Sequence, residues 1–195
     1  MRLSLPVAGI LLAMLTAPSP APAQGQSTSG QGAPLPAPPS GQPLATANLI
    51  GANGQPLGTA AFIGTPNGVL IQLRAETVPP GVHGLHIHEA GQCQPPDFRS
   101  AGGHFNPGGA VHGFLAPQGH HVGDLPNVFA HRNGDVWADI RTDLVTLGTG
   151  AASLFPANGT ALVLHAGPDD YKTDPAGAAG DRIACGVIVR TTQPR

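Results

Sequence analysis

Two histidines separated by one residue are the clearest sign of chemistry in this chain. In His86-Ile87-His88, alternate side chains of an extended strand point to one face, so both imidazoles can reach a single metal ion while Ile87 packs into a core. His83, three positions earlier, falls on the opposite face if the strand is regular there. The spacing therefore predicts a metal site on one face of a β-strand.

Further possible ligands follow in a long stretch without clear periodicity. It supplies three imidazoles and one carboxylate, a complete tetrahedral set of the kind that holds a structural Zn²⁺: His104, His112, His121 and Asp124. His86 and His88 form a second set of nitrogen donors with His165, which ends a distant extended segment. This second set suits copper, because Cu(II) prefers tetragonal nitrogen geometry. His120 is a possible competitor of His121, and His131 receives no role.

Strands and turns are the elements expected to position these residues. The 28 glycines and 22 prolines, with few aromatic residues, favour short strands over long helices, and no helical apolar pattern follows residue 23. Asn-Gly pairs at 53–54 and 133–134 indicate hairpin turns. Two stretches rich in His, Asp and Gly, 89–125 and 166–181, are predicted to be functional loops. We expect an all-β Greek-key sandwich or flattened barrel, with extended segments at 44–62, 69–74, 128–132, 136–140, 160–165 and 182–190.

Composition and charge narrow the possible partners. A hydrophobic fraction of 41% over 195 residues suits one well-buried domain. The formal net charge of -2 and the lack of any run of Lys or Arg remove the electrostatic footprint of a nucleic-acid binder. No nucleic-acid partner is therefore expected.

The N-terminal residues are typical of an export signal. Arg2 precedes an apolar run at 3–15 and a small-residue cleavage site at 21–23. The alternative is a membrane anchor, but the run is shorter than the roughly 20 residues that cross a bilayer. We expect a signal peptide at 1–23, a disordered linker rich in Gly, Pro, Gln and Ser at 24–43, and a single domain at 44–195. The protein would then be periplasmic or otherwise exported, without a membrane span.

Export also decides how the two cysteines are interpreted. Cys93 and Cys185 would lie in an oxidising compartment, where a disulfide persists. We predict that they pair, the alternative being two unrelated buried thiols.

Several stretches together resemble the copper-zinc superoxide dismutases in their exported bacterial form. In chain order they are GVHGLHIHEAGQC, SAGGHFNP, HVGDLPN, LVLHAGPDD and GDRIACGVIV, and the resemblance runs from about residue 44 to residue 189. It implies one copper and one zinc per chain. Copper would be bound by His86, His88, His104 and His165, and zinc by His104, His112, His121 and Asp124. The imidazolate of His104 would bridge the two ions.

The resemblance implies further roles and a reaction. His83 would be a structural histidine that hydrogen-bonds the backbone, Asp169 would link a copper-ligand histidine to a zinc-ligand histidine, and Arg182 would attract and position superoxide. The Cys93–Cys185 bridge would pin the surroundings of Arg182 to the strands. The reaction is dismutation of superoxide to oxygen and hydrogen peroxide by a redox-cycling copper, with His104 carrying a proton. The protein would be a monomer or a homodimer.

The second stretch, 166–181, departs from the corresponding loop of the animal enzymes. The second loop is short, and Lys172 is its only base against Asp169, Asp170, Asp174 and Asp181, so steering by a lysine cluster is not expected.

One alternative function is a non-catalytic periplasmic copper-binding protein on the same fold, against which Arg182 and the shared His104 argue. A copper-only dismutase would not need the zinc set, and a purely structural surface protein would leave the spaced histidines unexplained.

Overall fold

The structure is a computed structural model that describes residues 44–192. This part of the chain contains nine antiparallel strands. The predicted signal peptide and linker, residues 1–43, lie outside the described residues. No helix within 44–192 is long and apolar enough to cross a membrane. The strands are β1 (Ala45–Gly51), β2 (Pro56–Thr65), β3 (Gly68–Ala75), β4 (Gly81–His83), β5 (Leu85–His88), β6 (Val128–Ala130), β7 (Val136–Thr142), β8 (Ala161–His165) and β9 (Arg182–Arg190).

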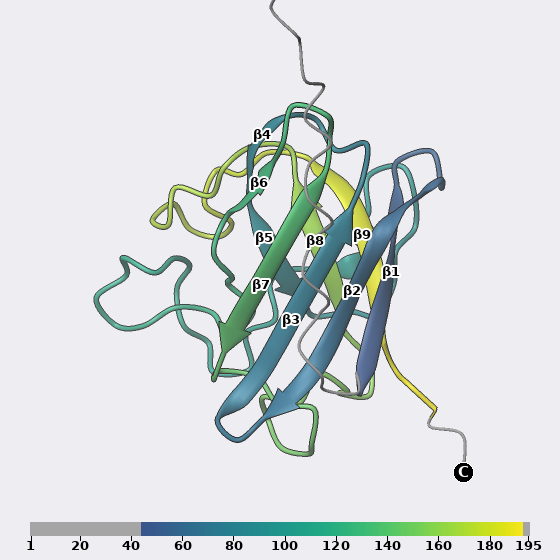
Figure 1. Cartoon of the computed structure of the whole chain (residues 1–195). Helices are drawn as coiled ribbons and strands as arrows, with labels where there is room; N and C mark the ends of the chain where they lie inside the picture. The colour runs from purple at the N-terminus through teal and green to yellow at the C-terminus, as the bar shows by residue number, and fades with distance from the viewer. Residues whose placement is uncertain (1–43, 193–195) are drawn as a thin grey trace, which may run out of the picture. The chain divides into compact units, whose positions relative to one another are not determined.

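All nine strands belong to one sheet, in the order β4-β6-β7-β3-β2-β1-β9-β8-β5. Figure 1 shows β7, β3, β2 and β1 side by side in one layer, with β5 and β8 behind them. β4 and β5 stand at opposite ends of this order although only Gly84 separates them in the chain. One extended segment therefore pairs with β6 through its first half and with β8 through its second, which nearly closes the sheet into a barrel. The predicted all-β sandwich or flattened barrel is confirmed.

Gly84 marks the point where this segment changes partners. Its N–H donates to the carbonyl of Gly167 at 2.8 Å, and its own carbonyl accepts from the N–H of His165 at 2.9 Å. A Cβ at this position would lie 3.0 Å from the Cβ of Ala179, which leaves little room for a larger residue. The missing side chain thus allows the loop after β8 to pack directly against the strand that carries His86.

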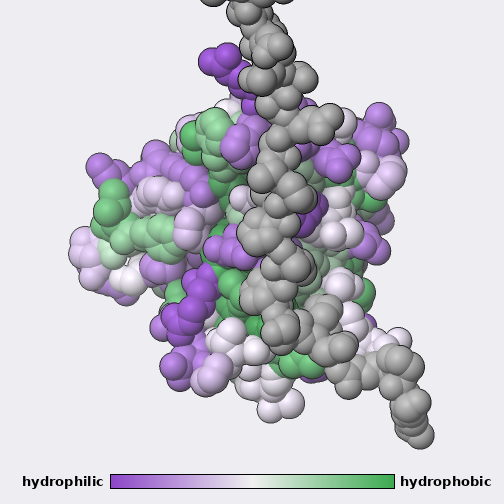
Figure 2. All heavy atoms as spheres, viewed as in Figure 1, coloured by the Kyte–Doolittle hydropathy of each residue, from purple (hydrophilic) through white to green (hydrophobic). Residues whose placement is uncertain are grey.

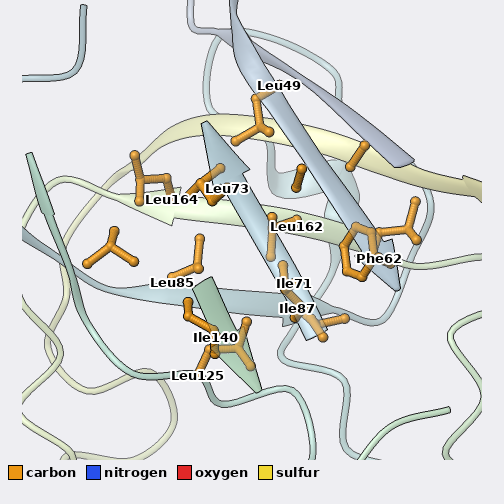
Figure 3. Close-up of a cluster of buried hydrophobic side chains, with 14 of the residues drawn as sticks. Leu49, Phe62, Ile71, Leu73, Leu85, Ile87, Leu125, Ile140, Leu162 and Leu164 are labelled. Carbon is orange, nitrogen blue, oxygen red and sulfur yellow. The ribbon is translucent and has the colours of Figure 1, made fainter. Parts of the chain in front are cut away.

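Alternation along the strands builds the core. Leu85 and Ile87 of β5 are fully buried among apolar side chains from both layers, whereas His86 and His88 alternate with them in the sequence and face the other side. Figure 3 shows Leu85 and Ile87 together with Ile71, Leu162 and other labelled side chains of this cluster. Fully burying a Leu or Ile side chain stabilises a fold by about 1.5–3 kcal/mol. Burial of Leu85 and Ile87 therefore fixes the register of β5, and with it the face on which His86 and His88 lie.

Long loops connect β5 to β6 and β8 to β9, as expected from their lack of periodicity. The first contains only one short 3-10 helix, η1 (Arg99–Ala101), and the second, residues 166–181, contains no helix or strand. Three exposed apolar side chains lie in the first loop, and in Figure 2 hydrophobic colour gathers on the part that projects from the barrel. They are Val111, Phe114 and Leu115.

Two predictions about this framework can be compared with the structure directly. Cys93 and Cys185 form a disulfide with a Cα–Cα distance of 5.6 Å, which confirms their pairing. The strand predicted at 128–132 is shorter than expected, because the N–H of His131 already donates to the carbonyl of Asp135 and closes the turn. The other extended segments agree with the sequence prediction to within a few residues.

Candidate metal centre

Four imidazoles from distant parts of the chain converge beside β5, on the face of this strand that is opposite the apolar core. Their ligand atoms lie within 4.8 Å of one another and all four residues are buried: His86, His88, His104 and His165. In each ring, one buried nitrogen has no hydrogen-bond partner among the described residues: His86 Nδ1, His88 Nε2, His104 Nε2 and His165 Nε2. An unsatisfied buried polar group costs about 1–3 kcal/mol, so four of them in one place indicate a bound cation.

The opposite nitrogen of three of these rings has an acceptor. His86 Nε2 lies 2.8 Å from Asp169 Oδ2, His88 Nδ1 lies 3.0 Å from the carbonyl of Gly102, and His165 Nδ1 lies 3.2 Å from the carbonyl of Gly180. These acceptors can only receive a proton, so each ring donates through that nitrogen. The remaining nitrogen then presents its lone pair to the shared centre, as a metal ligand requires.

A second set shares one ring with the first. It consists of His104, His112, His121 and Asp124, all buried. Asp124 Oδ1 lies 2.8 Å from His104 Nδ1, 3.1 Å from His112 Nδ1 and 3.2 Å from His121 Nδ1, and His104 Nδ1 and His121 Nδ1 are 3.3 Å apart.

These distances fit an ion better than a set of hydrogen bonds. Ligands placed tetrahedrally about 2.0–2.1 Å from a Zn²⁺ lie about 3.3 Å from each other, close to the separations observed. Oδ1 of Asp124 faces all three imidazole nitrogens, and between Nδ1 of His104 and Nδ1 of His121 there is room for at most one proton. A metal ion at the centre of the set would bind all four atoms. His104 faces the first set through Nε2 and the second through Nδ1, so a single ring joins the two sets.

Protonation states also favour metal binding. Burial lowers the pKa of His88 well below its usual value, that of His104 to about 4 and that of His165 to about 3. Burial opposes ionisation of Asp124, but the hydrogen bonds from His104 and the Gly113 N–H outweigh it and lower the pKa of this carboxyl to about 2. At neutral pH His88, His104 and His165 are therefore neutral and Asp124 is ionised, the forms that bind metals.

Asp169 connects the two sets from behind. Its Oδ2 accepts from His86 Nε2 at 2.8 Å, and its Oδ1 accepts from His112 Nε2 at 3.0 Å and from the N–H of Tyr171 at 2.7 Å. Burial alone would raise the pKa of Asp169, but these three donors hold it well below its usual range. The ionised carboxylate therefore fixes the tautomer and orientation of one ring from each set.

An open cleft of about 450 Å³ leads to the first set. His88, His104, His165 and Arg182 all line it. The guanidinium of Arg182 is held by two carbonyls of the first loop, donating to Phe98 at 2.7 Å and to Gly102 at 2.6 Å. Burial lowers the pKa of Arg182, although a guanidinium stays protonated in proteins. The cleft thus places a fixed cation beside the converging imidazoles.

The remaining histidines lie outside both sets. His83 is buried, and its two ring nitrogens lie 2.8 Å from the carbonyl of His165 and 2.7 Å from that of Pro79. His120 Nδ1 is hydrogen-bonded to the carbonyl of His121 and lies 3.8 Å from Asp124 Oδ2, so His121 and not His120 reaches the second set. His131 packs against Phe129 in a turn.

Comparison with known proteins identifies the family. Residues 57–188 match the family model described as copper/zinc superoxide dismutase. The chain belongs to this family. Among the superoxide dismutases most similar to it, Superoxide dismutase [Cu-Zn] 2 of Aquifex aeolicus is 53% identical over 146 residues, which cover 74% of this chain and 85% of that protein. Superoxide dismutase [Cu-Zn] of Caulobacter vibrioides is 48% identical over 126 residues, covering 63% and 72%.

Solved structures of copper/zinc superoxide dismutases and related proteins share the fold. A double mutant of a SOD-like protein from Bacillus subtilis superposes with a TM-score of 0.71 at 38% identity, covering 73% of this chain and 95% of that one. The Cu/Zn superoxide dismutase from Brucella abortus gives a TM-score of 0.61 at 29% identity, covering 73% and 98%.

Three residues of the centre have roles that the sequence analysis does not predict. The side chain of Asn127 pairs with the backbone of Asp169, its Nδ2 donating to the Asp169 carbonyl at 2.9 Å and its Oδ1 accepting from the Asp169 N–H at 2.8 Å. Asp174 and Tyr171, the only tyrosine in the chain, also contact the ligand segments. No spacing rule could have indicated them, because their contacts are to backbone atoms far away in the sequence.

Proposed function

We propose that this protein is a copper-zinc superoxide dismutase that converts superoxide to oxygen and hydrogen peroxide. The observation that carries the proposal is the sharing of His104. Its Nε2 converges with three other ring nitrogens that, like it, have no hydrogen-bond partner within residues 44–192, and its Nδ1 belongs to a second set of four donors. A protein that only bound copper would need neither the second set nor a cation in the cleft. Membership of the family supports the same conclusion.

The chemistry of the donors supports a different metal for each set. The set of four nitrogens, His86, His88, His104 and His165, suits copper, and the set His104, His112, His121 and Asp124 suits zinc. When bound, copper supplies one-electron chemistry that oxidises one superoxide to oxygen and reduces a second to hydrogen peroxide, whereas zinc has no redox chemistry and contributes charge and geometry.

The side chains of the chain bind the anion and move a proton. Arg182, held by two carbonyls at the cleft, attracts superoxide and orients it. His104 can hold a proton at Nε2 while its Nδ1 stays in the zinc set, and can donate this proton to the peroxide product, which takes its second proton from water. Asp169 keeps the rings of His86 and His112 aligned during this exchange. His83 ties the β8 end that carries His165 to the backbone at Pro79.

We also propose that the protein acts outside the cytoplasm. The signal sequence expected at 1–23 and the cleavage site at 21–23 support export, most simply to the periplasm. The disulfide between Cys93 and Cys185 suits an oxidising compartment.

The test is to express the full chain, recover the exported protein, and measure copper, zinc and superoxide removal. We expect one copper and one zinc per chain and rapid removal. His104→Ala should lose activity together with the link between the metals, and Arg182→Ala should lose activity while it keeps both metals. Bound copper without activity would favour the alternative of a non-catalytic copper-binding protein.

A further inference from the structure

The second loop, residues 166–181, is hydrogen-bonded to the segment that supplies three of the four zinc-set ligands. This segment, residues 112–127, contains His112, His121 and Asp124. Three of its backbone N–H groups donate to acceptors on only two second-loop residues, Tyr171 and Asp174. The N–H of His112 donates to Asp174 Oδ1 at 2.7 Å. The N–H of Leu115 donates to the Tyr171 carbonyl at 3.1 Å, and the N–H of Asn127 donates to the Tyr171 hydroxyl at 2.7 Å.

The two loops also meet at positions where only glycine fits. A Cβ on Gly113, which has a positive φ of 99°, would overlap the carbonyl of Tyr171. A Cβ on Gly177 would lie 2.7 Å from Nε2 of His112 in the first loop, and would also overlap the carboxylate of Asp169 that accepts from this nitrogen. The second loop therefore lies close both to the backbone next to His112 and to the ring of His112, and small movements of this loop would be transmitted to this ligand.

Tyr171 is held in a backbone conformation that disfavours its own side chain. Its φ is 61°, in the left-handed region, which bulky residues other than glycine rarely adopt because their side chains are strained there. In this conformation its N–H donates to Asp169 Oδ1, its carbonyl accepts from Leu115 and its hydroxyl accepts from Asn127. Its ring packs against Phe114 at a centroid distance of 5.1 Å. The contacts compensate for the unfavourable conformation.

We propose that Tyr171 and Asp174 are positioning residues that hold the 112–127 segment in register and so retain the zinc ion. The inference rests on the proposed function, because it needs zinc in this set. It gives the short second loop a role other than steering the anion, for which Lys172 is its only base. His112 is the ligand most affected, since Asp169 holds its ring and Asp174 holds its backbone.

The test compares zinc retention in the copper- and zinc-loaded protein. Zinc release into excess EDTA would be followed for wild type, Tyr171→Phe and Asp174→Ala. Asp174→Asn is the matched control, because its side-chain oxygen can still accept from the His112 N–H, and Lys172→Gln is a control for the loop's charge. We expect zinc release to accelerate about tenfold in Tyr171→Phe and in Asp174→Ala, the size of one lost hydrogen bond. The two controls should stay within about twofold of wild type.

A second readout separates positioning from general stability. Co²⁺ placed in the zinc set should show altered visible bands in Tyr171→Phe and Asp174→Ala, while the copper content stays at the wild-type value. Unchanged zinc release in both variants, or parallel loss of copper and zinc, would overturn the proposal. If Tyr171→Phe does not fold, equal release rates for Asp174→Ala and Asp174→Asn overturn it. A wild-type chain that binds copper and removes superoxide without zinc would refute the zinc assignment, and this inference with it.

Discussion

Removing the disulfide is predicted to cost the metal-free protein several kcal/mol. Cys93 and Cys185 are 92 residues apart, and closing a loop of this length stabilises the fold by about 4.6 kcal/mol in the chain-entropy model. Since 1 kcal/mol moves the midpoint by about 2–4 °C in a domain of this size, we expect Cys93→Ala with Cys185→Ala to lower Tm by roughly 9–18 °C. Alanine is chosen because Cys185 is fully buried beside Phe98 and Val163, where serine would bury a hydroxyl group.

Thermal unfolding gives Tm and urea unfolding gives the free energy of unfolding, both for the metal-free double variant at pH 7 beside wild type with and without a reducing agent. Reduced wild type should approach the variant. A local effect should accompany the global one, because the first loop that Cys93 anchors also carries the carbonyls of Phe98 and Gly102 that hold Arg182. The metal-loaded variant should therefore remove superoxide more slowly at unchanged metal content. A loss of unfolding free energy below about 1 kcal/mol would refute the reasoning.

Three further predictions follow from the centre. Asp169→Asn should weaken zinc binding about 10- to 100-fold, because an amide has only one oxygen and cannot accept from both the His86 and His112 rings as the carboxylate does. Competition with a chelator measures this affinity, and an unchanged value would contradict the prediction. Metal-free protein should lose stability as pH falls from about 6.5 toward 4, because folding lowers the pKa values of His88, His104 and His165 and the unfolded chain then binds more protons. An unfolding free energy, measured with urea, that stays constant over this pH range would argue against it. Arg182→Gln should lower kcat/KM and flatten its dependence on ionic strength while both metals are retained, and an unchanged salt dependence would exclude the steering role.

The strands and part of the metal centre were predictable because local rules determine them. Alternation places His86 and His88 on one face of β5, and the Asn-Gly pairs close hairpins where they were expected. The double use of His104 could not be predicted from spacing, because it lies in a loop without periodicity, and only the resemblance to a family indicated it. β6 ends two residues before the predicted boundary at residue 132, because the turn begins at His131.

The residues that escaped prediction act through the backbone. Asn127, Tyr171 and Asp174 bind N–H and carbonyl groups that every residue possesses, so neither residue type nor spacing shows which partner they will find. Their positions depend on how two long loops pack against each other after the barrel has formed. Such contacts become visible only in three dimensions.

Anomalous diffraction at the copper and zinc absorption edges, from crystals of the metal-loaded protein, tests most directly whether His104 serves both metals. We expect one copper peak beside Nε2 of His104, among His86, His88 and His165, and one zinc peak beside Nδ1 of the same ring. A single peak, or two peaks that do not flank His104, would contradict the bridged copper-zinc centre.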